Sequence, residues 1–202
     1  MTEVHPRTQA LLDRVAAAAD SDGRLALPDV ASWDIFPFEG ELLVKRLEPP
    51  VLPEPLRHGV GGVDCGSCAA GLHDAMWTDG RWKLVGPVPV PIPVVLLCPI
   101  DHLDLADLDE AYAAELGRLT VRLERALTEF GGVARVHVMK VGDGSEHLHV
   151  WFFARPDGLL QLRGSSLSDW TDCLPPMPTD EWDAVARELA VRLAETRGRA
   201  LG

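Results

Sequence analysis

The sequence has few basic residues for its length. Its 202 residues include 19 Lys and Arg against 31 Asp and Glu, so the formal net charge is −12 and the pI is near 4.9. A protein that follows a nucleic-acid backbone needs a basic stripe, and docking on an anionic membrane needs a basic patch. We therefore expect neither nucleic acid nor membrane as a partner. A small anionic ligand stays compatible with the composition, because a few local donors can outweigh the field of the whole chain.

Long apolar runs are also lacking. The longest candidate, "VPVPIPVVLLCPI", is short and interrupted by prolines, whereas a bilayer-spanning helix needs about 20 apolar residues. The N-terminal stretch is too charged for the apolar region of a signal peptide. Together with only four cysteines, this predicts a cytoplasmic protein in a reducing compartment, where a close cysteine pair indicates metal binding or redox chemistry before a disulfide. Cys98, in an apolar strand, and Cys173 are interpreted as packing residues.

No glycine-rich loop joins a strand to a helix, which opposes a doubly wound nucleotide-binding fold. Apolar residues at helical spacing predict helices over residues 6–19, about 107–130 and about 180–196, the last capped by Thr179 or Asp180. Strands are predicted in "RWKLVG", in the apolar run "VVLLCP", in "ARVHVMKV", where apolar residues alternate, and in "EHLHVWFFA". Strands and helices segregated in this order predict an α+β fold with an antiparallel sheet.

The predicted elements divide the chain into three segments of one structural domain. Residues 1–62 form a helix and a proline-rich arm, residues 63–157 a core, and residues 158–202 a C-terminal extension with a helix. Proline at the density found in the arm excludes regular helix and central strand. We expect the arm to pack on the core, because a free linker rarely carries the three aromatic residues found between positions 33 and 38.

The motif "CGSC" places Cys65 and Cys68 in a Cys-x-x-Cys pair. Two such thiolates can reach one ion from a tight turn, and zinc would need two further ligands, commonly histidine. His102, just after the strand "VVLLCP", and His147, at the start of the last strand, are the candidates. A redox pair stays open, although no strand–motif–helix pattern of the thioredoxin type surrounds the motif. Simple packing of two free cysteines also stays open.

The last predicted strand carries two histidines on one face. Since residues i and i+2 of a strand point to the same side, His147, His149 and Trp151 share one face, and the alternate apolar residues should face the core. Two adjacent imidazoles have a pKa useful for nucleophilic or acid–base chemistry. The alternative is a half-buried strand with incidental histidines.

The stretch "HLHVWFFAR" resembles the histidine-triad (HIT) motif, His-φ-His-φ-His-φ-φ followed by arginine, where φ is apolar. His147 and His149 fall on the first two histidines, Trp151 on the third and Arg155 on the arginine. A Cys-x-x-Cys pair, an apolar strand ending in "PIDH", a leucine-rich helix and the motif strand come in the order usual for the family. The resemblance covers residues 65–156 and implies a HIT-like sheet with a long helix, which in this family often forms a homodimer.

The resemblance also implies a zinc site and a chemistry. In zinc-bearing members, and in the similar galactose-1-phosphate uridylyltransferases, the ligands correspond to Cys65, Cys68, His102 and His147. The family hydrolyses or transfers nucleotidyl groups, and the middle histidine, here His149, forms a covalent intermediate on the α-phosphate. The implied ligand is a nucleotide or another small phosphate-containing molecule. Its phosphate would be bound by cations and backbone N–H groups, for which the candidates are Lys140, Gly142, Gly144, Ser145 and Arg155.

Two features depart from the family pattern. Trp151 replaces the third histidine, which contacts the phosphate and assists the leaving group; the uridylyltransferases carry glutamine there. Trp151 keeps one N–H donor but cannot act as a general acid. The segment "KVGDGSEH" before the motif is short, and Asp143 and Glu146 bring negative charge to it. A catalytically inactive zinc-containing binding or structural protein therefore stays an alternative, as does a site in which Trp151 stacks on a non-nucleotide substrate.

Overall fold

The computed structural model describes residues 6–87 and 89–201, and the chain divides into two compact units, residues 1–56 and 57–202. The first unit contains helix α1 (Pro6–Ala18), a short 3₁₀ helix (Asp29–Ser32) and otherwise irregular chain. The predicted N-terminal helix is thus confirmed to within one residue. The packing of the arm on the core stays a prediction.

The second unit is built on one six-stranded sheet with the strand order β4-β5-β3-β2-β1-β6, in which all neighbours are antiparallel. The strands are β1 (Ala75–Thr78), β2 (Trp82–Val85), β3 (Val94–Pro99), β4 (Val133–Met139), β5 (Val150–Pro156) and β6 (Arg199–Ala200). The α+β class with an antiparallel sheet is confirmed. The short strands β1 and β6 were not predicted, and β5 begins at Val150, later than the predicted strand.

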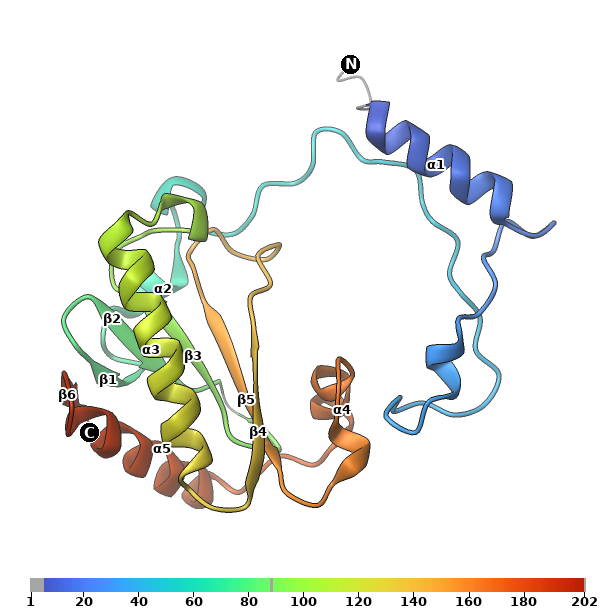
Figure 1. Ribbon diagram of the computed structural model, residues 1–202. Coiled ribbons are helices and arrows are strands. Elements are labelled where there is room, and N and C mark those ends of the chain that lie inside the picture. The colour runs from blue at the N-terminus through green and yellow to red at the C-terminus, as the bar shows by residue number, and fades with distance from the viewer. Residues whose placement is uncertain (1–5, 88, 202) are drawn as a thin grey trace. The chain divides into compact units, whose positions relative to one another are not determined.

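Two long helices cover one face of the sheet. Helices α3 (Glu110–Thr128) and α5 (Thr179–Ala194) pack against the strands and against each other (Figure 1). Asp109 caps α3 by accepting a hydrogen bond from the Tyr112 N–H at 2.7 Å. The predicted cap of α5 was wrong, because Pro178 holds that position and no side chain caps the helix. None of the described helices has the length and apolar character needed to cross a membrane.

The other face of the sheet carries shorter elements. Helix α2 (Gly66–Ala70) contains Cys68 and follows directly on Cys65, and α4 (Leu167–Cys173) lies beside β5, away from α3 (Figure 1). Helix α4 was not predicted from the sequence. Cys173, at the end of α4, is exposed, so it is not a packing residue. Cys98 is buried in β3 as predicted, and burial raises the pKa of its thiol to about 12.

The alternation of β5 decides what lies on each face. Val150 pairs with Leu97, and Phe152 pairs with Val95 of β3; all four are buried in the core. Trp82 of β2 lies on the same face, because Leu84, two residues later, pairs with Leu97. Its ring contacts the ring of Tyr112 in α3 edge-on, with centroids 5.7 Å apart, so this face meets α3. Because alternate residues point to opposite sides, His149 and Trp151 lie on the face that carries α2, as their spacing predicted.

Candidate metal centre and nucleophilic histidine

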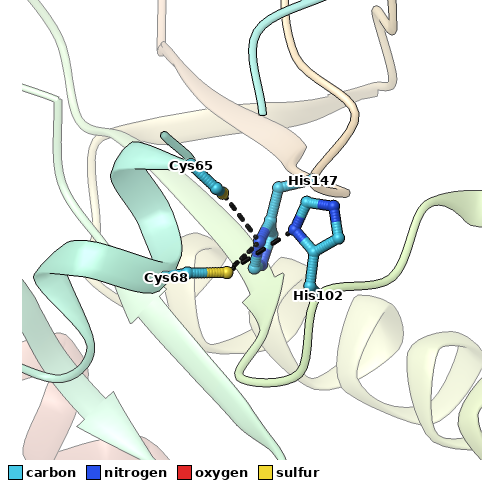
Figure 2. A group of neighbouring side chains, drawn as sticks. All are labelled: Cys65, Cys68, His102 and His147. Atoms are coloured by element: carbon cyan, nitrogen blue, oxygen red, sulfur yellow. Dashed lines mark hydrogen bonds between the residues drawn. The ribbon is translucent and has the colours of Figure 1, made fainter. Parts of the chain in front are cut away.

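Four side chains from three separate segments converge beside the sheet (Figure 2). Cys65 precedes α2 and Cys68 lies within it, His102 follows β3, and His147 precedes β5. One ligand atom from each lies within 4.8 Å of all the others. Cys65 and His147 are buried, whereas Cys68 is exposed. The four residues form a site that can hold a metal ion.

The distances fit a tetrahedral ion. Bonds of about 2.3 Å to sulfur and about 2.0–2.1 Å to nitrogen place the sulfur and nitrogen ligands about 3.6 Å apart at the tetrahedral angle. His147 Nδ1 lies 3.5 Å from the Sγ atoms of both Cys65 and Cys68, and His102 Nδ1 lies 3.5 Å from Cys68 Sγ. A donor set of two sulfurs and two imidazole nitrogens at this spacing is typical of structural zinc.

Both histidines have their other ring nitrogen engaged. His147 Nε2 lies 2.9 Å from the carbonyl oxygen of Pro99, which can only accept a hydrogen bond, so Nε2 carries the proton. His102 Nε2 lies 3.4 Å from Glu146 Oε2, and donation to this carboxylate gives it the same tautomer. The Nδ1 lone pairs therefore face the thiols. Such outer partners orient metal-binding histidines and raise their basicity as ligands.

The surroundings set the protonation of the ligands. Burial lowers the pKa of His147, which favours the neutral imidazole that a metal requires. Burial acts to raise the pKa of Cys65, but the backbone N–H groups of Cys68 and Ser67 and contacts with the Cys68 and His102 side chains outweigh it, and the pKa falls. Burial and the neighbouring Cys65 raise the pKa of Cys68. One thiol is thus prepared to lose its proton first.

The backbone before the cysteine pair is tightly turned. Asp64, directly before Cys65, has a φ of 52° and is the one non-glycine residue with positive φ in the described part of the chain. Gly59 has a φ of 77°, and a Cβ atom there would lie 3.1 Å from Cys65 Cβ. Left-handed conformations of this kind cost energy for side chains other than glycine and are concentrated at functional sites.

Lys83 anchors the α2 turn from inside, a role that the sequence did not suggest. Its side chain is 1% exposed, and its Nζ donates to the carbonyls of Ser67 and Gly71 at 3.1 and 2.7 Å and to Asp74 at 3.1 Å. Three acceptors satisfy the three donors of the ammonium group. The only signal in the sequence was one cation inside an otherwise apolar strand.

Replacing Lys83 with methionine should destabilise the protein. The substitution keeps the apolar stem but leaves the Ser67 and Gly71 carbonyls without their donor, so we expect a loss of about 3 kcal/mol in the free energy of unfolding. Denaturant unfolding measures it. Lys45, which is exposed in the first unit, provides the matched control, Lys45→Met. Equal stability of the two variants would show that Lys83 does not hold the turn.

His149 is fixed in one tautomer with its outer nitrogen available. Its Nδ1 lies 2.9 Å from the His147 carbonyl oxygen, so Nδ1 donates and Nε2 carries the lone pair. In the part of the chain that the structure describes, no group makes a hydrogen bond with Nε2. An imidazole nitrogen with an open lone pair can act as a nucleophile.

Trp151 continues the same face. Its ring meets that of His149 edge-on at 6.1 Å and stacks on Phe153 at 5.8 Å with an interplanar angle of 16°. No residue between 6–87 or 89–201 accepts a hydrogen bond from its Nε1–H. The indole is therefore held by packing, and its one donor is left for a ligand.

The loop before the motif offers backbone N–H groups. The carbonyls of Gly142, Gly144 and Ser145 accept hydrogen bonds from residues 57 and 58, whereas no described residue accepts from the N–H groups of 142–145. The Ser145 hydroxyl accepts from the His147 N–H at 3.3 Å. Consecutive free N–H groups can bind an anion, which suits the predicted phosphate loop.

The two predicted cations are placed differently. Lys140 lies beside this loop, and its Nζ is 3.4 Å from Asp104 Oδ1. Arg155 is 7% exposed and donates to the carbonyls of Pro156 and Leu159 at 3.2 and 3.3 Å. It lies about 16 Å along β5 from Val150 at ~3.3 Å per residue. The structure therefore places Lys140 at the loop, paired with Asp104, and Arg155 at the far end of β5.

The described geometry defines an α+β unit in which a Cys2His2 metal-ligand cluster adjoins a histidine whose Nε2 is open.

No protein-family model matches the sequence, and no curated protein matches it. Solved structures are similar to it: a Zn-bound histidine triad family protein from Mycobacterium smegmatis has 18% identity and a TM-score of 0.48, and covers 66% of this chain and 97% of its own. A histidine triad protein from Marinobacter aquaeolei VT8 has 19% identity and a TM-score of 0.49, with 63% and 94% covered. One from Sinorhizobium meliloti 1021 has 20% identity and a TM-score of 0.48, with 59% and 90% covered.

Proposed function

We propose that the protein hydrolyses or transfers a nucleotidyl group through a covalent intermediate on His149. The observation that carries the proposal is the fixed tautomer of His149, with Nδ1 bonded to the His147 carbonyl and Nε2 open. The resemblance of "HLHVWFFAR" to the histidine-triad motif supports the same role. The free N–H groups of residues 142–145 provide donors where phosphate charge would develop.

The first step forms a phosphorus–nitrogen bond. The Nε2 lone pair attacks the α-phosphorus as the bond from phosphorus to the leaving group breaks, and the leaving group departs with the electron pair and takes a proton from solvent. In the second step water, or another acceptor hydroxyl, attacks phosphorus, loses its proton and releases the imidazole. The His147 carbonyl stabilises the Nδ1 proton as His149 gains positive charge in the intermediate.

The metal site has a structural role in this proposal. The donor set and spacing of Cys65, Cys68, His102 and His147 fit zinc, which would join α2, the segment after β3 and the segment before β5. All four protein ligands are available, so no position is left open for substrate. The residues of this chain, and not the ion, then carry the chemistry.

Trp151 makes the reaction depend on the leaving group. Because an indole cannot supply a proton, we expect the rate of the first step to fall steeply as the pKa of the leaving group rises. Trp151→His places an ionisable group there, and should raise the rate for a poor leaving group about 100-fold and flatten the dependence. Rates measured on a series of aryl esters of one nucleoside monophosphate test this. Trp151→Phe, which keeps an aromatic ring but adds no ionisable group, should retain the steep slope. An unchanged slope in Trp151→His would contradict the role assigned to position 151.

Turnover of defined substrates tests the proposal as a whole. Incubation with nucleoside phosphoramidates and dinucleoside polyphosphates should yield nucleoside monophosphate or its transfer product. Failure of every substrate, with the ligand cluster loaded with zinc, would refute the proposed activity.

A zinc-containing binding protein is the second candidate. The observation that favours it is Trp151, whose ring stands at the third triad position, packed between His149 and Phe153. Stacking of a planar ligand on this face, with no turnover, would distinguish it. Quenching of tryptophan fluorescence by nucleotides that are not consumed would support it.

A further inference from the structure

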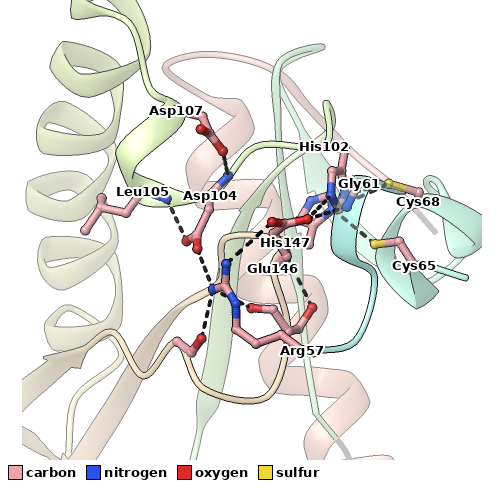
Figure 3. A network of polar contacts seen from close by, with 12 residues as sticks. Arg57, Gly61, Cys65, Cys68, His102, Asp104, Leu105, Asp107, Glu146 and His147 are labelled. Carbon is pink, nitrogen blue, oxygen red and sulfur yellow. Dashed lines mark hydrogen bonds and ion pairs between the residues drawn. The ribbon is translucent and has the colours of Figure 1, made fainter. Parts of the chain in front are cut away.

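Glu146 contacts the metal-ligand cluster from outside, although its sequence position suggested a charge at the phosphate. Its Oε2 lies 3.4 Å from His102 Nε2 and accepts from the Gly61 N–H at 2.5 Å (Figure 3). Its Oε1 lies 3.6 Å from the Arg57 guanidinium. The carboxylate is thus directed to a metal ligand and a cation.

Arg57 joins Glu146 to the loop before His149. Its Nη1 donates to Asp104 Oδ2 at 2.6 Å and to the carbonyls of Gly142 and Ser145 at 2.9 and 3.4 Å (Figure 3). Bonds between a guanidinium and carboxylates are among the stronger hydrogen bonds in proteins. The hydrogen bond to Asp104 raises the pKa of Arg57, although burial acts to lower it. The guanidinium therefore stays positively charged.

The backbone of the same segment supports the link. His58 donates from its N–H to the Gly144 carbonyl at 3.0 Å and accepts from the Glu146 N–H at 2.9 Å. Together with the Arg57 bonds, these bonds direct the carbonyls of Gly142, Gly144 and Ser145 toward residues 57 and 58. Contacts therefore run without a break from His102 through Glu146 and Arg57 to this loop.

We propose that Glu146 and Arg57 are positioning residues through which the bound metal ion fixes the 142–146 loop. With the ion in place, His102 is held and directs its Nε2–H at Glu146, and Glu146 holds Arg57 against the Gly142 and Ser145 carbonyls. The description of this loop as a phosphate site rests on the proposed function; the link between metal and loop does not. Because binding at coupled sites is reciprocal, an anion that binds the ordered loop should also raise the affinity of the cluster for the metal ion.

Metal affinity of two matched variants tests the link without any substrate. Glu146→Gln keeps the shape but removes the charge, and we expect zinc affinity to fall about 10-fold or more in competition with a chromogenic chelator. Asp143→Asn removes one charge from the same loop at an exposed residue and should leave affinity unchanged. Equal zinc affinity of the two variants would overturn the role of Glu146.

Hydrogen exchange of the full chain tests the loop directly. In wild-type protein, zinc should slow exchange of the His58 and Glu146 N–H groups, whose hydrogen bonds join the loop to the 57–62 segment. Arg57→Met should speed exchange of these two groups at saturating zinc, while exchange in α3 stays unchanged. Zinc-bound wild type with the same loop exchange as Arg57→Met would overturn the proposal. Neither readout uses turnover. A protein that showed both effects but no turnover would therefore refute the proposed function and leave the link between metal and loop intact.

Discussion

Replacing His149 with asparagine should reduce nucleotidyl turnover at least about 1,000-fold, because the variant has no lone pair with which to form the covalent bond. Asparagine can still donate a hydrogen bond to the His147 carbonyl, so the local backbone need not change. The measurement is steady-state hydrolysis of a nucleoside phosphoramidate, with zinc content and melting temperature compared in the same samples.

His137 offers a matched control for this substitution. It lies on β4 opposite Phe153, on the same face of the sheet, and burial lowers the pKa of its imidazole. His137→Asn changes the same functional group and should leave turnover within a few-fold of wild type. If His149→Asn kept its activity, or if both variants lost it equally, His149 would not be the nucleophile.

Removing the metal should produce the largest effect on stability. An ion that binds only the folded protein, with free zinc about 1,000-fold above its Kd, stabilises the protein by about 4 kcal/mol. For a protein of this size that corresponds to a change in Tm of about 8–16 °C. We therefore expect Cys65→Ser to lower Tm by about this amount in the presence of zinc and to remove most of the response of Tm to a chelator. Differential scanning calorimetry measures both.

Cys173 provides the control for Cys65, because it is exposed and distant from the ligand set along the chain. Cys173→Ser should keep the zinc content of about one ion per chain and the wild-type Tm. Metal-free wild-type protein with an unchanged Tm would refute the metal centre, whichever variant was compared.

The elements with long regular patterns were predictable from the sequence. Leucines at helical spacing predicted α3 and alternation predicted β4, because burial of one face imposes the period. A continuous apolar run predicted β3, which is buried on both faces. Strands β1 and β6 were missed, and β6 has only two residues, too few to show a period. Helix α4 was missed for a similar reason, as its seven residues contain polar side chains on most positions.

The metal ligands were predictable because their residue types are restricted by chemistry. The residues that hold these ligands in place were not predictable from the sequence. Lys83 and Glu146 contact backbone and side chains far away in the chain, and a single sequence gives no signal of such pairs. Glu146 shows the consequence: its charge suggested repulsion of phosphate, whereas the structure directs it to His102 and Arg57.

The most direct test is the intact mass of the protein during turnover. The protein, mixed with a nucleoside phosphoramidate and quenched under basic conditions that preserve phosphorus–nitrogen bonds, should gain the mass of one nucleotidyl group, located by peptide mapping on His149. Turnover without this adduct, or an adduct on another residue, would contradict the mechanism.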